Sequence, residues 1–198
     1  MSAAGRAAIF LDRDGTLNRE VDYLRRVEDL ELLPGVAPAL RRLAEAGFAL
    51  VVVTNQSGIG RGLLDEERLA AIHARLTREL AAEGVELLDV LWCPHLPPEE
   101  PGGVECSCRK PAPGMLLEAA RRHGLDLHRS WMVGDSLRDA EAGVAAGVRA
   151  ALVRTGKPLP DGPRALGSAE VPLLPNLEAL ADLVLDGGHE PQGRKRER

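Results

Sequence analysis

Three aspartates have the types and spacing that a divalent cation requires. Asp12 and Asp14 stand two residues apart directly after one apolar run, and Asp135 follows another. Gly15 lets the chain turn, so both carboxylates of the pair can point to one side. Two adjacent carboxylates repel each other, and Mg²⁺ is usually held by a few carboxylates together with waters and substrate oxygens. The pattern favours a Mg²⁺ site over the alternative, a polar turn with two solvated aspartates.

A second group offers soft metal ligands. It contains the three cysteines of the chain and one histidine, namely Cys93, His95, Cys106 and Cys108. Three thiolates and an imidazole suit tetrahedral Zn²⁺, although the one-residue gaps are tighter than usual. The alternative, a disulfide, leaves one cysteine over and ignores the histidine. Four protein ligands leave no open position, so the sequence predicts a structural zinc loop that delivers the neighbouring Arg109 and Lys110.

Apolar runs that alternate with amphipathic segments must position these groups. Expected strands are Ala7–Leu11, Phe48–Val53, Leu87–Trp92, Trp131–Val133 and Ala150–Val153. Expected helices are Val36–Ala46, a long one from about Asp65 to Gly84, Gly114–His123, Asp139–Ala146, and one from the N-cap Asn176 to about Leu185. This alternation predicts an α/β fold with a doubly wound, mostly parallel sheet, whose ligands bind at the carboxyl ends of the strands.

Composition bounds the organisation and the partners. The chain has 198 residues, 44% hydrophobic and 28% charged, which predicts one domain over about 1–186 with the zinc loop at about 93–110. A disordered tail is expected over 187–198. The net charge of −5 leaves no basic surface for nucleic acid. Neither an apolar stretch of about 20 residues nor a signal peptide is evident, which favours a cytoplasmic protein without membrane contact. The sequence also gives no sign of an obligate protein partner.

Four segments together resemble the signatures of the haloacid dehalogenase (HAD) superfamily. They are Asp12-Arg-Asp-Gly-Thr-Leu, Thr54-Asn-Gln, Lys110 and Gly134-Asp-Ser-Leu-Arg-Asp139, in the order and positions of that superfamily. The resemblance runs from about residue 9 to residue 139. It implies a Rossmann-like fold and Mg²⁺-dependent phosphoryl transfer.

The resemblance also implies a role for each residue. Asp12 would attack phosphorus and become an aspartyl phosphate, while Asp14 would protonate the leaving alkoxide and later deprotonate water. Mg²⁺ would bind Asp12, the backbone carbonyl of Asp14, and Asp135. Thr54 and Lys110 would stabilise the phosphoryl oxygens.

The zinc loop narrows the resemblance to two phosphatase groups. Cys-x-His and Cys-x-Cys before Arg-Lys-Pro resemble heptose 1,7-bisphosphate 7-phosphatases and histidinol-phosphate phosphatases, and residues 10–18, 53–62, 108–117 and 153–158 look more like the heptose group. Such an enzyme would release the 7-phosphate and leave heptose 1-phosphate for nucleotide-activated heptose synthesis.

By that likeness the substrate would be lined by Glu20, Val21, Asp22, Tyr23, Asn55, Gln56, Ser57, Arg109 and Ser136. Arg109 suits a second phosphate because its guanidinium binds two oxygens at once. Ser136 departs from the lysine that many heptose enzymes carry, so one charged contact is missing.

Other functions stay open. A phospho-acceptor signalling domain also uses aspartates and Mg²⁺ at strand ends, but it needs neither the acid-base Asp14 nor a zinc loop. A phosphosugar mutase needs a lid that excludes water, whereas the segment between Thr16 and Thr54 has room for only one helix and no separate cap domain. Hydrolysis is therefore favoured. His73, His123, His128 and His189 are expected to have no catalytic role, and Arg61 is as consistent with solvent as with substrate.

Overall fold

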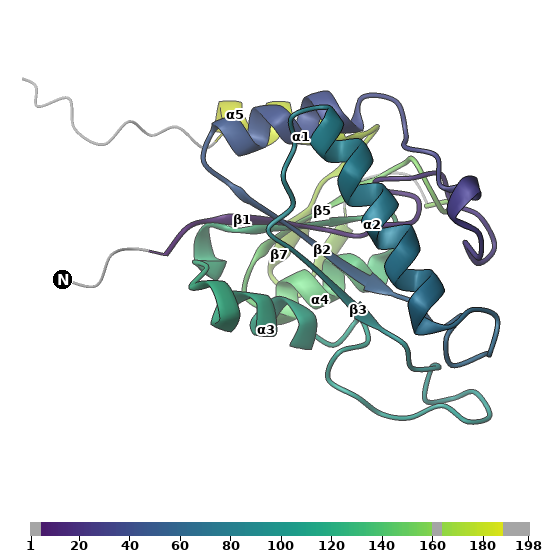
Figure 1. Ribbon diagram of the computed structural model, residues 1–198. Coiled ribbons are helices and arrows are strands. Elements are labelled where there is room, and N and C mark those ends of the chain that lie inside the picture. The colour runs from purple at the N-terminus through teal and green to yellow at the C-terminus, as the bar shows by residue number, and fades with distance from the viewer. Residues whose placement is uncertain (1–4, 160–163, 188–198) are drawn as a thin grey trace, which may run out of the picture.

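A six-stranded parallel sheet forms the centre of the protein. The computed structural model describes residues 5–159 and 164–187, and its sheet has the strand order β3-β2-β1-β4-β5-β8 (Figure 1). The strands are β1 (Ala8–Leu11), β2 (Ala49–Asn55), β3 (Asp89–Cys93), β4 (Trp131–Gly134), β5 (Arg149–Val153) and β8 (Leu173–Leu174). Every neighbouring pair is parallel. The predicted doubly wound fold is therefore confirmed, and the strands end at one common edge.

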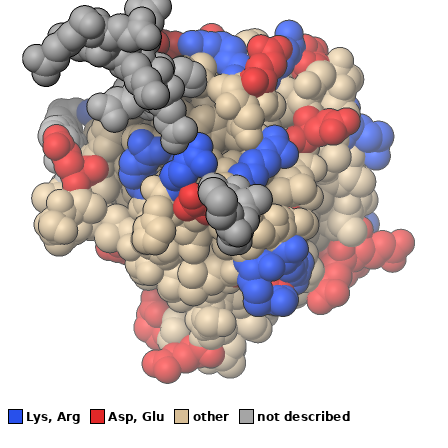
Figure 2. All heavy atoms as spheres, turned by 90° about the vertical axis from the view of Figure 1, so that its left-hand side faces the viewer, with Lys and Arg blue, Asp and Glu red and all other residues tan. Residues whose placement is uncertain are grey.

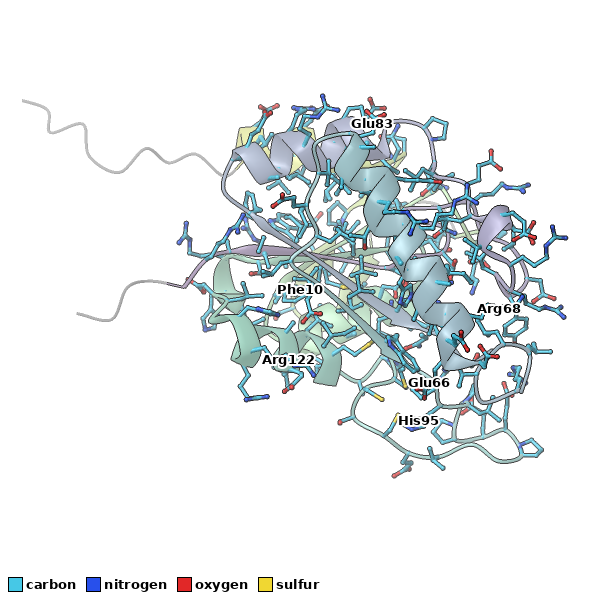
Figure 3. The ribbon with its side chains drawn as sticks, viewed as in Figure 1. Phe10, Glu66, Arg68, Glu83, His95 and Arg122 are labelled. Carbon is cyan, nitrogen blue, oxygen red and sulfur yellow. The ribbon has the colours of Figure 1, made fainter. Side chains whose placement is uncertain are left out.

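Strand β1 lies in the middle of this sheet and is buried on both faces. Ile9 and Leu11 belong to the larger apolar cluster, while Ala8 and Phe10 belong to a second cluster on the opposite face. Phe10 lies between the sheet and the helices drawn below it (Figure 3). An uninterrupted apolar strand fits this position, because successive side chains point to opposite faces and both faces are covered.

Helices cover both faces (Figure 1). The upper layer holds α1 (Val36–Glu45), α2 (Glu66–Ala82) and α5 (Leu177–Gly187), and the lower layer holds α3 (Gly114–His123) and α4 (Leu137–Ala145). Helix α2 buries residues at helical spacing, including Leu69, Ile72, Leu76 and Leu80, all 0% exposed. Its Asp65 side chain accepts a hydrogen bond from the Arg68 backbone N–H at 2.8 Å, which caps the first turn as expected of this residue type.

Several boundaries differ from the sequence prediction. Strand β2 runs two residues further than Val53, through Asn55, and β3 spans Asp89–Cys93 rather than Leu87–Trp92. Helix α4 begins at Leu137 rather than Asp139, because the Ser136 backbone N–H donates to the Asp139 carboxylate at 3.0 Å and so caps the helix. The shift places Asp139 inside the first turn, where it faces the strand ends.

Short elements near the C-terminus were not predicted. They are the hairpin of β6 (Arg164–Leu166) with β7 (Ala169–Val171), and the two-residue strand β8, which extends the sheet beyond β5. Two 3₁₀ turns, Val27–Asp29 and Leu127–Arg129, were also missed. Strands of two or three residues are too short to show the alternation on which a strand prediction depends. Of the tail predicted over 187–198, residues 188–198 lie outside the described residues, and Gly187 is the last residue of α5.

The face opposite the carboxyl edge of the sheet carries scattered charges of both signs (Figure 2). No helix within the described ranges is both long enough and apolar enough to cross a membrane.

Candidate active site

A single cavity collects the predicted catalytic and substrate residues at the carboxyl edge of the sheet. Its volume is about 1050 Å³. The predicted residues that line it are Asp12, Asp14, Glu20, Val21, Asp22, Tyr23, Thr54, Asn55, Gln56, Ser57, Arg109, Lys110, Asp135 and Ser136. They come from the ends of three strands and from the loop between β3 and α3, so the parallel topology and the fold of this loop together bring them to one edge.

Lys110 occupies the floor of the site. Its Nζ donates to Asp12 Oδ1 at 2.7 Å and to the Val53 carbonyl at 2.8 Å, and it lies 2.6 Å from Asp139 Oδ1. The side chain is fully buried, which alone would lower its pKa, but the carboxylates of Asp12 and Asp139 outweigh burial and raise the pKa of Lys110. From the sequence, Asp139 is expected to orient either Lys110 or a metal-bound water rather than to touch Mg²⁺, and its contact with Lys110 places it where it can orient the lysine.

The loop that carries Lys110 is fixed to β2. Asn55 Nδ2 donates to the Lys110 carbonyl and Asn55 Oδ1 accepts from the Lys110 backbone N–H, both at 3.0 Å. The sequence prediction placed Asn55 at the sugar end of the site. It does line the cavity, but both ends of its amide bind Lys110, so its contacts anchor the lysine.

Asp14 faces a dense set of donors. Its carboxylate accepts from Arg13 Nη2 at 2.8 and 3.0 Å, from Asn18 Nδ2 at 3.0 Å and from Gln56 Nε2 at 2.9 Å. Burial raises the pKa of Asp14, but the charge and hydrogen bonds of Arg13 outweigh it and hold the pKa below its usual range. Gln56 Nε2 also donates to Thr54 Oγ1 at 2.9 Å, which leaves the threonine hydroxyl proton free to bind a phosphoryl oxygen.

The predicted Mg²⁺ ligands fit a divalent cation. Carboxylate oxygens of Asp12, Asp135 and Asp139 lie within 4.8 Å of one another. Both oxygens of Asp139 are engaged, Oδ1 by Lys110 Nζ and Oδ2 by the Ser136 backbone N–H, whereas Lys110 contacts Asp12 through Oδ1. Asp12 Oδ2 and Asp135 are therefore better placed to bind the ion. Burial and the nearby charge of Asp12 raise the pKa of Asp135 to about 6. A bound cation would relieve the repulsion between these two carboxylates. The Asp14 side chain is turned to its donors, so only its backbone carbonyl is available as a ligand.

Two glycines make room for Asp135. A Cβ added at Gly15 would lie 2.4 Å from Asp135 Oδ2, and one added at Gly156 would lie 2.1 Å from the same oxygen. The Lys157 backbone N–H donates to this oxygen at 2.8 Å. Close approach of two glycine backbones therefore fixes the carboxylate at the end of β4.

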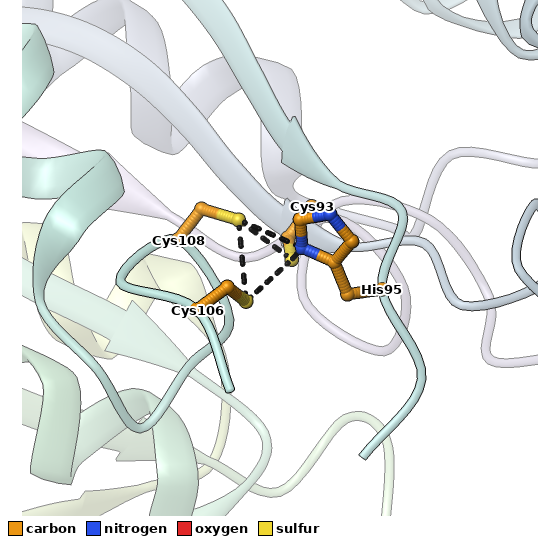
Figure 4. Close-up of side chains that lie close together, drawn as sticks. All are labelled: Cys93, His95, Cys106 and Cys108. Carbon is orange, nitrogen blue, oxygen red and sulfur yellow. Dashed lines mark hydrogen bonds between the residues drawn. The ribbon is translucent and has the colours of Figure 1, made fainter. Parts of the chain in front are cut away.

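The predicted zinc ligands converge (Figure 4). Cys106 Sγ lies 3.7 Å from Cys93 Sγ and 3.5 Å from Cys108 Sγ, and His95 Nδ1 lies 3.5 and 3.4 Å from Cys93 Sγ and Cys108 Sγ. A tetrahedral zinc with ordinary bond lengths places its ligand atoms about 3.5 to 3.8 Å apart. The Cys93–Cys108 separation of 2.9 Å is shorter and would widen around an ion. All three cysteines are free, so the disulfide alternative is not formed.

The cysteine and histidine cluster is connected to the cavity wall. Arg109 directly follows Cys108, and its Nη1 donates to the His95 carbonyl at 2.8 Å. Arg61, for which contact with solvent and contact with substrate were equally expected, lines the cavity. It forms an ion pair with Glu100 of the zinc loop, and its guanidinium lies 5.7 Å from the centre of the Tyr23 ring.

Sequence reasoning missed three residues at this site. Arg138 and Lys157 line the cavity, and Arg13 lies behind Asp14. The sequence did point to Lys157, because the chain contains few lysines and this one lies in the segment 153–158 that resembles the heptose phosphatases. Arg138 lies two residues after Ser136, and its Nε donates to Ser136 Oγ at 3.1 Å, a contact that the sequence did not indicate. Arg13 offered no signal, because an arginine between two aspartates is typical of a solvated turn.

Comparison with known proteins agrees with this geometry. Residues 107–180 match the family model described as HAD-hydrolase-like. The chain is 46% identical to the D-glycero-beta-D-manno-heptose-1,7-bisphosphate 7-phosphatase of Escherichia coli (strain K12), covering 89% of this chain and 91% of the relative. It is 44% identical to the enzyme of the same name from Yersinia pestis, covering 89% and 92%. The chain belongs to this phosphatase family.

A solved structure of the same kind shares the fold. The D,D-heptose 1,7-bisphosphate phosphatase from B. bronchiseptica, complexed with magnesium and phosphate, matches with a TM-score of 0.78 and 37% identity over 91% of this chain and 99% of that one. The present chain is thus an HAD-type phosphatase, and the expected reaction class is confirmed.

Proposed function

We propose that this phosphatase removes the 7-phosphate from D-glycero-β-D-manno-heptose 1,7-bisphosphate and leaves heptose 1-phosphate for nucleotide-activated heptose synthesis, in the cytoplasm. The observation that carries the proposal is a cavity with a nucleophile at one place and, at another, two guanidiniums that have no carboxylate partner among the described residues. Asp12 and Lys110 lie at its floor, and Arg109 and Arg138 line its wall. The anomer follows the names of the relatives.

The two guanidiniums suit a second phosphate. Among residues 5–159 and 164–187, neither Arg109 nor Arg138 has a carboxylate partner; they are held by the His95 carbonyl at 2.8 Å and by Ser136 Oγ at 3.1 Å. Burial and the nearby charge of Arg138 lower the pKa of Arg109, as expected of like charges that await an anion. Arg138 thereby replaces the cation that Ser136 lacks, and a bisphosphate is favoured over histidinol phosphate.

The chain's own residues account for the steps at the first phosphate. Asp12 attacks phosphorus in line, the ester oxygen leaves, and Asp14 donates a proton to that oxygen; Asp14 then takes a proton from the water that hydrolyses the aspartyl phosphate. Lys110 and Thr54 bind the phosphoryl oxygens. Lys110 also fixes the Asp12 carboxylate, because the same ammonium group contacts both the nucleophile and the buried Asp139.

Two metals complete the proposal. Asp12, Asp135 and the carbonyl of Asp14 would hold Mg²⁺, which neutralises the charge between an anionic nucleophile and an anionic phosphate. Cys93, His95, Cys106 and Cys108 would hold Zn²⁺, which stabilises the loop that positions Arg109 and Lys110.

Substrate competition tests the assignment. Phosphate release is measured with Mg²⁺ for both anomers of heptose 1,7-bisphosphate, histidinol phosphate and fructose 1,6-bisphosphate. We expect kcat/KM for the β anomer to exceed the others by about a hundredfold, or about 2.7 kcal/mol of transition-state discrimination. A preference for histidinol phosphate would overturn the substrate, and a stable phosphoprotein without turnover would favour the signalling alternative.

One variant tests the second-phosphate site separately. Loss of a charge-assisted contact of about 1.5 to 3 kcal/mol predicts that Arg138→Gln raises KM for the bisphosphate by about 10- to 150-fold. KM for heptose 7-phosphate should stay unchanged, because that substrate lacks the second phosphate. Arg129→Gln, an exposed arginine in the 3₁₀ turn Leu127–Arg129, is the matched control. Equal effects of Arg138→Gln on both substrates would contradict the assignment.

A further inference from the structure

Arg13 is the largest fully buried side chain of the described residues, and it lies directly between Asp12 and Asp14 in sequence. A buried ion pair is weak evidence for a stabilising role, because apolar residues of similar volume often stabilise a fold as well. A buried arginine that touches the predicted acid-base residue therefore needs another explanation.

The contacts of Arg13 leave its guanidinium one orientation. Nε and Nη2 donate to Asp14 Oδ1 at 3.1 and 3.0 Å, and Nη2 donates to Asp14 Oδ2 at 2.8 Å. Nη2 also donates to Gln56 Oε1 at 3.0 Å, and Nη1 lies 3.1 Å from His73 Nε2. The guanidinium is thus clamped between Asp14 and two acceptors on other elements.

His73 supplies the outer contact from α2. A guanidinium only donates, so the hydrogen bond requires a neutral ring with an unprotonated Nε2. Burial and the Arg13 charge lower the pKa of His73 to about 3, which keeps the ring in that state. The histidine is 8% exposed and lies 60 residues from Arg13 in sequence.

We propose that Arg13, held in place by His73 and Gln56, is the positioning residue that aims the Asp14 carboxyl at the leaving-group oxygen. The Asp14 side chain is 20% exposed, while the side chain of Arg13 is 0% exposed. The guanidinium therefore never meets the substrate and acts only through Asp14. This inference rests on the proposed role of Asp14 as the acid-base residue.

Leaving-group dependence separates this role from simple support of the fold. An aliphatic alkoxide needs a proton to depart, whereas p-nitrophenolate is a much weaker base and departs without one. Because kcat/KM reports only the steps through formation of the aspartyl phosphate, it isolates the protonation step. We expect Arg13→Met to lower kcat/KM for heptose 1,7-bisphosphate by about 10²- to 10⁴-fold, the usual contribution of general acid catalysis, and to lower it less than tenfold for p-nitrophenyl phosphate.

A pair of substitutions at His73 keeps the proposal testable if Arg13→Met does not fold. His73→Leu removes the acceptor and should lower kcat/KM for the sugar phosphate by at least about tenfold, again with little change for the aryl phosphate. His73→Gln keeps an acceptor oxygen and should restore most of the rate. Ile72→Ala, a neighbouring buried residue of α2, is the control for destabilisation alone and should affect both substrates equally.

Each outcome decides one question. Losses confined to the sugar phosphate, with rescue by His73→Gln, support positioning of Asp14. Equal losses for both substrates, or no loss in any variant, overturn it. Failure of the wild-type protein to hydrolyse any sugar phosphate while it hydrolyses p-nitrophenyl phosphate would instead overturn the proposed function.

Discussion

The ion pair beneath the nucleophile gives the most quantitative prediction. Lys110 lies 2.7 Å from Asp12 Oδ1 and 2.6 Å from Asp139 Oδ1, and Lys110 and Asp139 are 2% and 1% exposed. Removal of one partner from a buried pair costs about 3 to 5 kcal/mol, because the remaining charge stays buried without compensation. We therefore expect Lys110→Met, which leaves Asp12 and Asp139 without their shared cation, to lower the free energy of unfolding by about 3 to 5 kcal/mol. Asp139→Asn leaves Lys110 paired with Asp12 and should cost up to about the same amount.

The double variant tests whether the two side chains act as a pair. If they were independent, the two measured losses of free energy would simply add. In the Lys110→Met background Asp139 has already lost its cation, so replacing Asp139 as well removes no further ion pair. The loss of stability in the double variant should therefore be about 2 to 3 kcal/mol smaller than the sum of the two single losses. Urea unfolding of the wild type, the two single variants and the double variant, all without added metal, measures this coupling.

An exposed pair provides the control. Arg42 and Asp182 join α1 to α5 at 2.8 Å, with side chains 45% and 59% exposed. Asp182→Asn should cost no more than about 1 kcal/mol, since surface ion pairs contribute little. A coupling between Lys110 and Asp139 below about 0.5 kcal/mol would refute the view that this pair is built as one unit.

Three further predictions concern the metal sites. Gly156→Ala places a methyl group 2.1 Å from Asp135 Oδ2 and should weaken Mg²⁺ binding by about 10- to 100-fold by calorimetry. Gly147→Ala strains a position with φ of +77°, but its Cβ meets nothing within 4 Å, so it controls for backbone strain and should leave Mg²⁺ binding unchanged. Because burial and Asp12 raise the pKa of Asp135 to about 6, its ionised, ligating form is lost below that pH, and Mg²⁺ affinity should fall about tenfold per pH unit from pH 6 to 5; equal affinity at pH 5 and 7 would contradict this. Cys108→Ser should lower the zinc content from about one ion per chain and reduce activity by about tenfold or more. Ser107→Ala, at an exposed neighbouring position, should change neither the zinc content nor the activity. An active, zinc-free Cys108→Ser protein would show that the loop needs no metal.

The sequence was sufficient for the parallel sheet and for most of the site. Apolar runs such as Ile9–Leu11 and Val51–Val53 are buried on both faces, and the polar residues after them lie at the same edge because parallel strands end together. Gly47, Gly84 and Gly124 stand close after three of the predicted helices and have positive φ, the conformation in which glycine commonly ends a helix.

Long-range contacts explain what the sequence did not reveal. The clamp on Arg13 depends on His73, 60 residues away on a helix whose register only tertiary packing sets. The two hydrogen bonds between the Asn55 amide and the Lys110 backbone join residues that are 55 positions apart in sequence. His73 was expected to have no catalytic role. It is buried on α2, but burial alone does not reveal from which donor its ring accepts a hydrogen bond.

The most direct test of the account is the position of the bond that breaks. Phosphorus NMR of D-glycero-β-D-manno-heptose 1,7-bisphosphate treated with the protein and Mg²⁺ resolves the two ester phosphates. The account predicts that the 7-phosphate signal is replaced by inorganic phosphate while the 1-phosphate signal remains, and that Asp12→Asn abolishes the change without unfolding the protein. Loss of the 1-phosphate, or near-wild-type turnover by Asp12→Asn, would contradict it.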